Sequence, residues 1–257
     1  MTGRVASLWR YPVKGFTPER LAQAAVAAGG FFPCDRVYAV EDGPSGFDPA
    51  SPAWISKQKF TVLAKIAQVA RVRTAYDDAS GVLQASADGH PAFAGELTAP
   101  RGRDAFAAWL GRFLGEEASG PLQVVQGPGH RFTDHPRGYV SIVNLASVRD
   151  LESRLGQPLD PLRFRANVYV DGWPAWSENE APAETQVLLG GVRASLLSPI
   201  VRCAATHVDP LSGERDIDVV GALHHHLGHM NCGVYVRVLD GGTIDQGDPA
   251  FGAASPR

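Results

Sequence analysis

Short apolar segments separated by turn-forming residues dominate this chain and leave few folds open to it. The segments do not alternate with helices in the manner of βαβ units. The pattern therefore predicts a mainly β (α+β) fold, a barrel or folded sheet covered by a few helices. The clearest predicted strands are Val5–Trp9, Val82–Ser86, Val168–Asp171, Val192–Leu197 and Gly233–Leu239, and weaker ones include Leu21–Ala27, Val69–Tyr76, Leu122–Gln126 and Tyr139–Val143.

Three helices are predicted among these strands. Asp104–Leu114 carries an apolar stripe at helical spacing and stops at Gly115. A second helix follows Asn144, a good N-cap, and a third covers Asp218–His226. The segment between Trp173 and Glu184 contains Glu178, Asn179 and Glu180, and it is predicted to be a solvated polar loop.

Composition excludes several classes of protein. The chain has 257 residues, 44% of them hydrophobic, and a formal net charge of −3, so nothing points to a nucleic-acid or membrane partner. Its three cysteines, Cys34, Cys203 and Cys232, are far apart and form no C-x-x-C. This spacing argues against a disulfide framework, a structural zinc site and a chain-borne iron–sulfur cluster. We expect a cytoplasmic protein.

The segment Ser198–Gly213 holds the most reactive pattern, the dipeptide Arg202-Cys203 at the end of an apolar run. A thiol beside a positive charge loses its proton more easily, and the thiolate is the form that attacks electrophiles and binds metals. The alternative is that Cys203 is a buried small residue at a strand end.

A group of basic residues lies at or near the ends of predicted strands, together with the polar Asn167. Such a group around one thiol would suit a phosphorylated, electron-rich ligand whose metal takes the sulfur. The basic residues are Lys14, Arg36, Arg163, Arg165 and Arg202.

The histidine run His224–His226 offers a different metal site. His225 and His229 have the spacing of helical zinc ligands, but His226 stands where a zinc hydrolase has its glutamate base. No dinucleotide fingerprint, Walker loop or G-x-S-x-G elbow is present. A zinc hydrolase stays open as a lesser alternative.

Five motifs occur in an order that resembles one family. They are Y-P-V-K, D-R-V-Y-A-V, R-F-R-A-N, R-C-A-A-T-H-V-D-P-L-S-G and G-V-Y-V-R-V-L-D-G-G-T-I-D-Q-G-D. Together they resemble the MOSC family, named for the C-terminal domain of molybdenum cofactor sulfurase, with its N-terminal β-barrel partner domain. Among the members of this family, the chain resembles the mitochondrial amidoxime-reducing components and their bacterial relatives.

The resemblance implies an N-terminal domain over residues 1–120 and a MOSC domain over residues 121–257, completed by N-terminal strands. It implies a molybdenum–molybdopterin cofactor with Cys203 as the ligand to molybdenum. Lys14 and Arg36 match positions that hold the pterin phosphate, and Arg163 and Asn167 match others in that pocket. Arg165 and Arg202 join this cationic set, while Thr206 and Asp209 fall in the shared T-x-V-D-P segment. Gly15 and Val201 stand where many relatives carry serine.

The function implied is a molybdenum-dependent oxidoreductase that reduces N-hydroxylated small molecules such as amidoximes. With no iron–sulfur ligands and no dinucleotide fingerprint, the chain would need a separate electron-donor protein. Two alternatives remain: Cys203 carries a persulfide for sulfur transfer, or the protein carries the cofactor without turnover.

Overall fold

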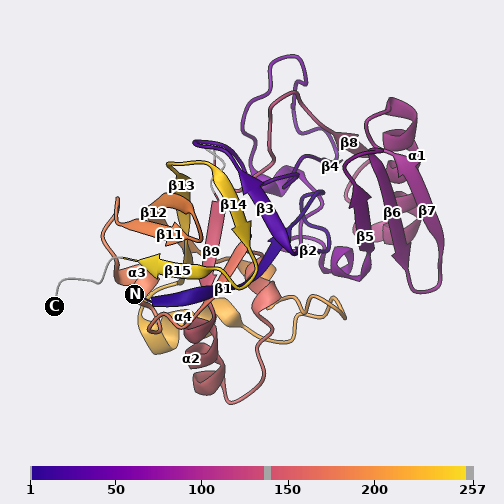
Figure 1. Ribbon diagram of the computed structural model, residues 1–257. Coiled ribbons are helices and arrows are strands. Elements are labelled where there is room, and N and C mark those ends of the chain that lie inside the picture. Colours follow the sequence, from indigo (N-terminus) through magenta and orange to yellow (C-terminus); the bar gives the residue numbers. More distant parts are fainter. Residues whose placement is uncertain (1, 136–139, 253–257) are drawn as a thin grey trace.

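The fold is built around a closed β-barrel (Figure 1). The structure is a computed structural model that describes residues 2–135 and 140–252. Within these residues, seven strands pair in the order β10-β9-β13-β12-β11-β15-β1, and a further pairing of β1 with β10 closes the barrel. The strands are β1 (Thr2–Arg10), β9 (Val140–Asn144), β10 (Val168–Asp171), β11 (Gln186–Leu189), β12 (Val192–Val201), β13 (Asn231–Val238) and β15 (Pro249–Gly252).

The first strand of the chain closes this barrel. Val5 and Leu8 of β1 are fully buried and lie opposite Val170 and Val168 of β10 in antiparallel register. β2 (Glu19–Leu21) extends the sheet beyond β1, and β3 (Gln23–Val26) pairs with β14 (Gly242–Asp245). The N-terminal strands therefore belong spatially with the barrel, while the domain boundary near residue 120 stays a prediction.

A second, smaller sheet lies apart from the barrel, on the right in Figure 1. It is an antiparallel meander, β5-β6-β7, and helix α1 packs against β7 and β8. The elements here are β4 (Ala39–Asp42), β5 (Arg73–Asp77), β6 (Val82–Ala87), β7 (His90–Glu96), α1 (Pro100–Leu114) and β8 (Leu122–Val125), with β4 pairing with β8. The predicted apolar stripe of α1 is confirmed, because Phe106, Trp109 and Leu110 are buried.

One predicted strand is corrected here. The first half of Val69–Tyr76 is a 3-10 turn, Ala67–Arg71, and the strand begins only at Arg73. Val69 and Ala70 are consecutive and both buried in the same core cluster. Successive side chains of a strand point to opposite faces of the sheet, so a strand would bury only one of the two in this core. A tight turn allows both to be buried there. The start of predicted strand Tyr139–Val143 lies outside the described residues, and the rest forms β9.

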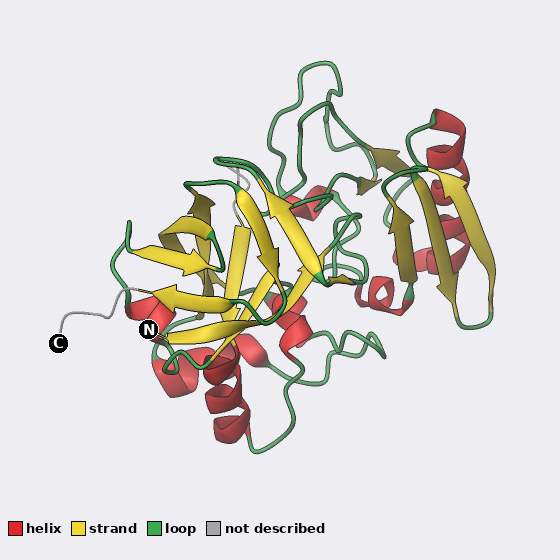
Figure 2. Cartoon of the chain, viewed as in Figure 1, coloured by secondary structure: helices red, strands yellow, loops and turns green. Residues whose placement is uncertain are grey.

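Helices α2 (Leu145–Leu155) and α4 (Val219–Leu227) lie together below the barrel in the view of Figure 2. Both have the ends that the sequence predicts. The Asn144 side chain accepts a hydrogen bond from the Ala146 amide at 3.0 Å, and Gly156 ends α2 in the left-handed conformation. The Asp218 side chain accepts from the Gly221 amide at 2.8 Å and caps α4.

The predicted polar loop around Glu178 is partly wrong. Ser177–Glu180 forms a short helix, α3, and the Glu178 side chain is buried. Its carboxylate accepts hydrogen bonds from Asn144 Nδ2 at 3.0 Å and Ser147 Oγ at 2.8 Å. Burial raises the pKa of Glu178 above its ordinary value, because these neutral donors offset only part of the lost hydration.

We expect Glu178→Gln to gain stability relative to the wild type as pH rises. The folded-state pKa of Glu178 lies above the unfolded value, so the folded protein keeps a proton that the unfolded chain has already lost. The wild-type free energy of unfolding therefore falls as pH climbs above the ordinary value of 4.5, by about 1.4 kcal/mol for each unit of pKa shift. Urea unfolding from pH 4 to pH 8 measures this. The exposed Glu180→Gln is the control, and a pH-independent difference between wild type and Glu178→Gln would contradict the expectation.

Candidate functional site

A cavity of about 350 Å³ lies between the barrel and the N-terminal region. Both parts of the chain contribute to its walls. Of the residues that the sequence suggests for the cofactor site, all but Asp209 line it: Lys14, Gly15, Arg36, Arg163, Arg165, Asn167, Arg202, Cys203 and Thr206. The fold thus gathers side chains that are up to about 190 positions apart in sequence around one space.

Cys203 lies just beyond the end of β12, where the chain turns into the 3-10 segment Ala204–His207. Its backbone is extended, and its carbonyl accepts hydrogen bonds from the Thr206 amide at 3.0 Å and from Thr206 Oγ1 at 2.9 Å. Thr206 is buried and fixes this turn. The thiol is consequently held at the cavity wall, and Cys203 is only partly buried.

The cation that contacts the thiol is Lys57, which the sequence analysis missed. Lys57 Nζ lies 3.3 Å from Cys203 Sγ and 3.2 Å from Asp134 Oδ2. Burial would lower the pKa of Lys57, but its interactions with Asp134 and with the Cys203 sulfur outweigh burial and raise that pKa. Lys57 lies in W-I-S-K-Q-K beside the exposed Lys59, and no local pattern tells which lysine faces the cavity.

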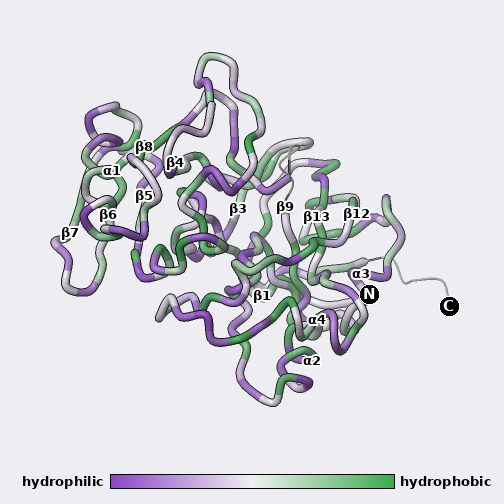
Figure 3. Tube along the Cα trace, turned by 180° about the vertical axis from the view of Figure 1, so that it is seen from behind, coloured by the Kyte–Doolittle hydropathy of each residue, from purple (hydrophilic) through white to green (hydrophobic). Residues whose placement is uncertain are grey.

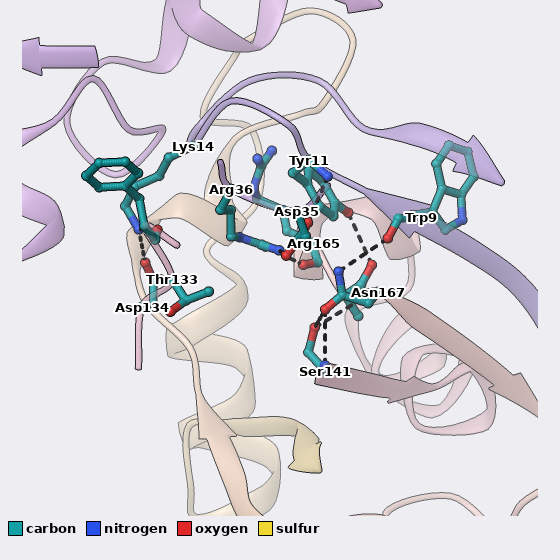
Figure 4. A network of polar contacts seen from close by, with 12 residues as sticks. Trp9, Tyr11, Lys14, Asp35, Arg36, Thr133, Asp134, Ser141, Arg165 and Asn167 are labelled. Atoms are coloured by element: carbon teal, nitrogen blue, oxygen red, sulfur yellow. Dashed lines mark hydrogen bonds and ion pairs between the residues drawn. The ribbon is translucent and has the colours of Figure 1, made fainter. Parts of the chain in front are cut away.

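Asp134 links Lys57 to Lys14 and was also missed. Lys14 Nζ donates to Asp134 Oδ1 and, at 2.8 Å, to the Phe132 carbonyl (Figure 4). The Lys14 side chain is 5% exposed, whereas that of Asp134 is 47% exposed. Desolvation would raise the pKa of Asp134, but Lys14 and Lys57 hold it well below its usual range. Thiol, lysine, carboxylate and lysine therefore form one continuous chain of polar contacts.

Arg36 and Arg165 form another part of the wall. Both guanidinium groups lie over the buried ring of Tyr11, at 4.6 Å and 4.3 Å from its centroid. Arg36 pairs with Asp35 and donates to the Arg165 carbonyl at 3.0 Å, and Arg165 donates to the Phe16 carbonyl at 2.7 Å. Both arginines have φ of 51°, an uncommon conformation for a residue with a side chain. Sequence patterns give no sign of it.

Arg163 is buried and forms ion pairs with two carboxylates. Its guanidinium donates to both oxygens of Asp216, at 2.8 Å and 2.7 Å, and to Asp209 at 3.2 Å. Asp209 also accepts from the Leu211 and Ser212 amides, so it shapes the loop and supports Arg163 from outside the cavity. The Nε of Arg163 is buried and has no hydrogen-bond partner within the described residues. A ligand oxygen in the cavity is the kind of acceptor this donor lacks.

Arg202 and Asn167 are largely engaged in the frame of the site. Arg202 donates to the Cys232 carbonyl through Nε and Nη2, and to the Phe164 carbonyl at 2.8 Å. The contacts thus place Lys57, and not Arg202, against the sulfur. Asn167 accepts from the Ser141 amide and hydroxyl and donates to the Trp9 carbonyl at 3.3 Å, which ties three barrel strands together (Figure 4).

Gly15 and Val201, the two positions at which the resemblance led us to expect serine, differ in their surroundings. Gly15 has φ of +91°, and a Cβ placed on it would lie 2.4 Å from the Thr61 carbonyl oxygen. The backbone here therefore requires glycine. Val201, in contrast, is 64% exposed at the cavity wall and offers an apolar surface next to Cys203.

The histidine alternative gains no support. His224, His225 and His226 are exposed, and His229 Nδ1 accepts from the Asn231 amide at 3.1 Å. Across residues 2–135 and 140–252, no group of three or more His, Cys, Asp or Glu side chains could hold a metal ion. Burial raises the pKa of the Cys34 thiol to about 11 and that of the Cys232 thiol to about 12.

Comparison with known families decides the identity of this fold. The MOSC domain matches residues 129–250, and the MOSC N-terminal beta barrel domain matches residues 2–117. The chain belongs to the MOSC family. The family resemblance seen in the sequence is thereby confirmed, and residues from both matched regions line the cavity.

Curated relatives of this MOSC protein are molybdenum cofactor sulfurases. The protein of Drosophila erecta is 29% identical over 153 residues, which cover 55% of this chain and 19% of the relative. That of Caenorhabditis elegans is 27% identical over 139 residues, covering 52% and 19%. The chain spans about a fifth of the length of these relatives.

Among solved structures, the YUAD protein from Bacillus subtilis covers 100% of this chain and 98% of its own, with a TM-score of 0.48 and 13% identity. YiiM from Geobacillus stearothermophilus covers 44% of this chain and 53% of its own, with a TM-score of 0.36 and 20% identity.

Hydrophobic and hydrophilic residues are interspersed along the MOSC chain (Figure 3), and no described helix is long and apolar enough to cross a membrane. The cytoplasmic location stays a prediction.

Gly15→Ser should be markedly more destabilising than Gly43→Ser. Both glycines have positive φ, but a Cβ at Gly43 would meet nothing within 4 Å. The strained backbone alone costs about 1–3 kcal/mol, and the clash with the Thr61 carbonyl should add about 1–3 kcal/mol at Gly15. Urea unfolding of both variants measures the difference. An equal loss of unfolding free energy in the two variants would contradict this, because the backbone at residues 61–62 would then move aside without cost.

Proposed function

We propose that the cavity binds a molybdenum–molybdopterin cofactor and that Cys203 is the protein ligand to its molybdenum. The observation that carries this proposal is a thiol held at the wall of a cavity lined by six cationic side chains within the described residues. A positive charge next to a thiol favours the thiolate, which is the form of cysteine that binds metals, and a cationic wall suits a phosphate. MOSC family membership supports the same cofactor.

The residues of the cavity suit such a group by their chemistry. Lys14 and Arg36 would hold the phosphate, and the unpartnered Nε of Arg163 would donate to another oxygen of the ligand. Arg165 adds positive charge, while Arg202 and Asn167 keep the wall in shape. Thr206 fixes the peptide that carries the thiol. When bound, the cofactor supplies two-electron oxygen-atom transfer, and the protein supplies the binding site and its electrostatics.

The reaction we propose is the reduction of N-hydroxylated or N-oxygenated small molecules. Its electrons would come from a separate donor protein, because the three cysteines of the chain cannot hold an iron–sulfur cluster and no dinucleotide fingerprint is present. The exposed Val201 beside Cys203 gives the substrate an apolar surface. We also propose a cytoplasmic location for this activity.

Sulfur transfer is the second candidate, and one contact favours it. Lys57 Nζ at 3.3 Å from Cys203 Sγ would stabilise the anion of a persulfide as well as a thiolate. The relatives' name, molybdenum cofactor sulfurase, is consistent with this role. A carrier that binds the cofactor without turnover is the third candidate, since neither Gly15 nor Val201 offers the cofactor a hydroxyl.

Cys203→Ala tests the ligand assignment. The chain should be expressed in a host that makes the cofactor, and molybdenum per chain should be measured by elemental analysis. We expect the Cys203→Ala variant to lose at least about nine-tenths of its molybdenum, because removing a metal ligand costs a tenfold or larger loss of affinity. Cys34→Ala, a thiol outside the cavity, is the matched control. Full molybdenum content in Cys203→Ala would refute the assignment.

The persulfide alternative has its own measurement. After incubation with a cysteine desulfurase and cysteine, a sulfur carrier should gain the mass of one sulfur atom at Cys203 and lose it on reduction. If sulfur transfer is the function, this adduct forms in the wild type and in Cys34→Ala but not in Cys203→Ala. An unmodified Cys203 in the wild type would exclude it.

A further inference from the structure

The sulfur end of the cavity has a charge distribution of its own. Lys57 and Lys14 share the single carboxylate of Asp134, so the polar chain next to the thiol contains two cations and one anion. The Lys57 side chain is 33% exposed, against 5% for Lys14. Lys57 is therefore the cation of this polar chain that can meet a small molecule approaching Cys203, and the Asp134 side chain beside it is 47% exposed.

The other cationic side chains of the cavity do not cancel this excess of positive over negative charge. Arg36 and Arg163 have carboxylate partners, in Asp35 for the first and in Asp216 and Asp209 for the second. Arg165 and Arg202 have only carbonyl and aromatic partners among the contacts of the described residues. The six cations are therefore paired with four carboxylates, which leaves the cavity with an excess of positive charge. Low-dielectric walls concentrate such a field on a ligand in a cleft.

We infer that Lys57 makes the Cys203 end of the cavity selective for anionic small molecules. As a consequence, the substrate carries negative charge next to the group that reacts, as in an oxoanion or a carboxylate-bearing N-oxygenated compound. This second step rests on the proposed function, whereas the selectivity itself is a property of the protein alone. A neutral molecule of the same shape gains nothing from the Lys57 ammonium.

The thiol of Cys203 can report this selectivity directly. Iodoacetate and iodoacetamide differ little in shape, and only the first is an anion. Both alkylate by the same step: the thiolate sulfur forms a bond to the CH₂ carbon as the carbon–iodine bond breaks and iodide leaves. Both require the thiolate, so the ratio of their rates at one pH does not depend on how much thiolate is present. The ratio measures the local field alone.

The experiment uses the 257-residue chain expressed without the cofactor. Rates for the two reagents are followed at Cys203 by peptide mass spectrometry, which separates it from Cys34 and Cys232. A neutral model thiol gives the reference ratio. We expect the wild-type iodoacetate-to-iodoacetamide ratio to exceed this reference by about threefold or more, as for a partly exposed charge pair. The preference should shrink in high salt, because mobile ions screen exposed charges.

Three variants make the inference falsifiable. Lys57→Met should bring the ratio close to the reference, and Lys57→Arg should keep it high. Asp134→Asn should raise the ratio above the wild-type value, because it removes the negative charge that Lys14 and Lys57 share. Lys59→Met changes an exposed lysine two residues away and should leave the ratio unaltered.

The outcomes separate the two levels of the proposal. An equal ratio in wild type and Lys57→Met, or a lower ratio in Asp134→Asn, would overturn the anionic selectivity whatever the metal content shows. A high ratio that depends on Lys57, in a chain that binds no molybdenum, would support the selectivity and refute the proposed cofactor. If Lys57→Met fails to fold, the opposite shifts expected for Asp134→Asn and high salt still decide the question.

Discussion

The pairing of β1 with β10 holds the site together. It joins residues 2–10 to residues 168–171. The first strand of the chain therefore becomes part of a barrel whose other strands come from the second half of the sequence. Tyr11 and Lys14 follow directly after β1, and Arg165 and Asn167 come directly before β10. Antiparallel pairing brings these two chain segments to the same barrel end. Lys14 and Arg165 thus converge because this strand pairing places them at one end of the barrel, and no attraction for a ligand is needed to bring them together.

Charge in the cavity is handled by local compensation. Gathering like charges is unfavourable unless each is hydrated or paired, and several of these side chains are too buried to be hydrated. The protein spreads the compensation over Asp35, Asp134, Asp209 and Asp216, and over backbone carbonyls for Arg165 and Arg202. The guanidinium groups of Arg36 and Arg165 both contact the ring of Tyr11. The result is a stable wall that still has positive charge to offer a ligand.

The sequence predicted the barrel, the helices and most of the cavity for one reason. Strand periodicity, N-caps and motif order are properties of short segments, and the residues adjacent to strand ends follow from them. Lys57 and Asp134 were not found because Lys57 lies in a short 3-10 segment, Lys57–Lys59, and Asp134 in a loop, and the paths of both depend on distant packing. Lys59 also has the same local sequence signals as Lys57. The sequence also assigned the thiol's cation to Arg202. The chain neighbour of Cys203 turns to the Cys232 carbonyl instead, because adjacent side chains on an extended backbone point in opposite directions.

The position of Lys57 changes how the thiol should be understood. An arginine fixed by carbonyls would give Cys203 a permanent electrostatic background, whatever the ligand. A lysine that shares a half-exposed carboxylate is different, since its ammonium can move between the sulfur, Asp134 and an incoming anion at little cost. The buried Lys14 cannot move in this way, because it is held by the Phe132 carbonyl as well. One end of the cavity is therefore rigid and suited to a permanently bound group, and the other end is adaptable and suited to a ligand that exchanges.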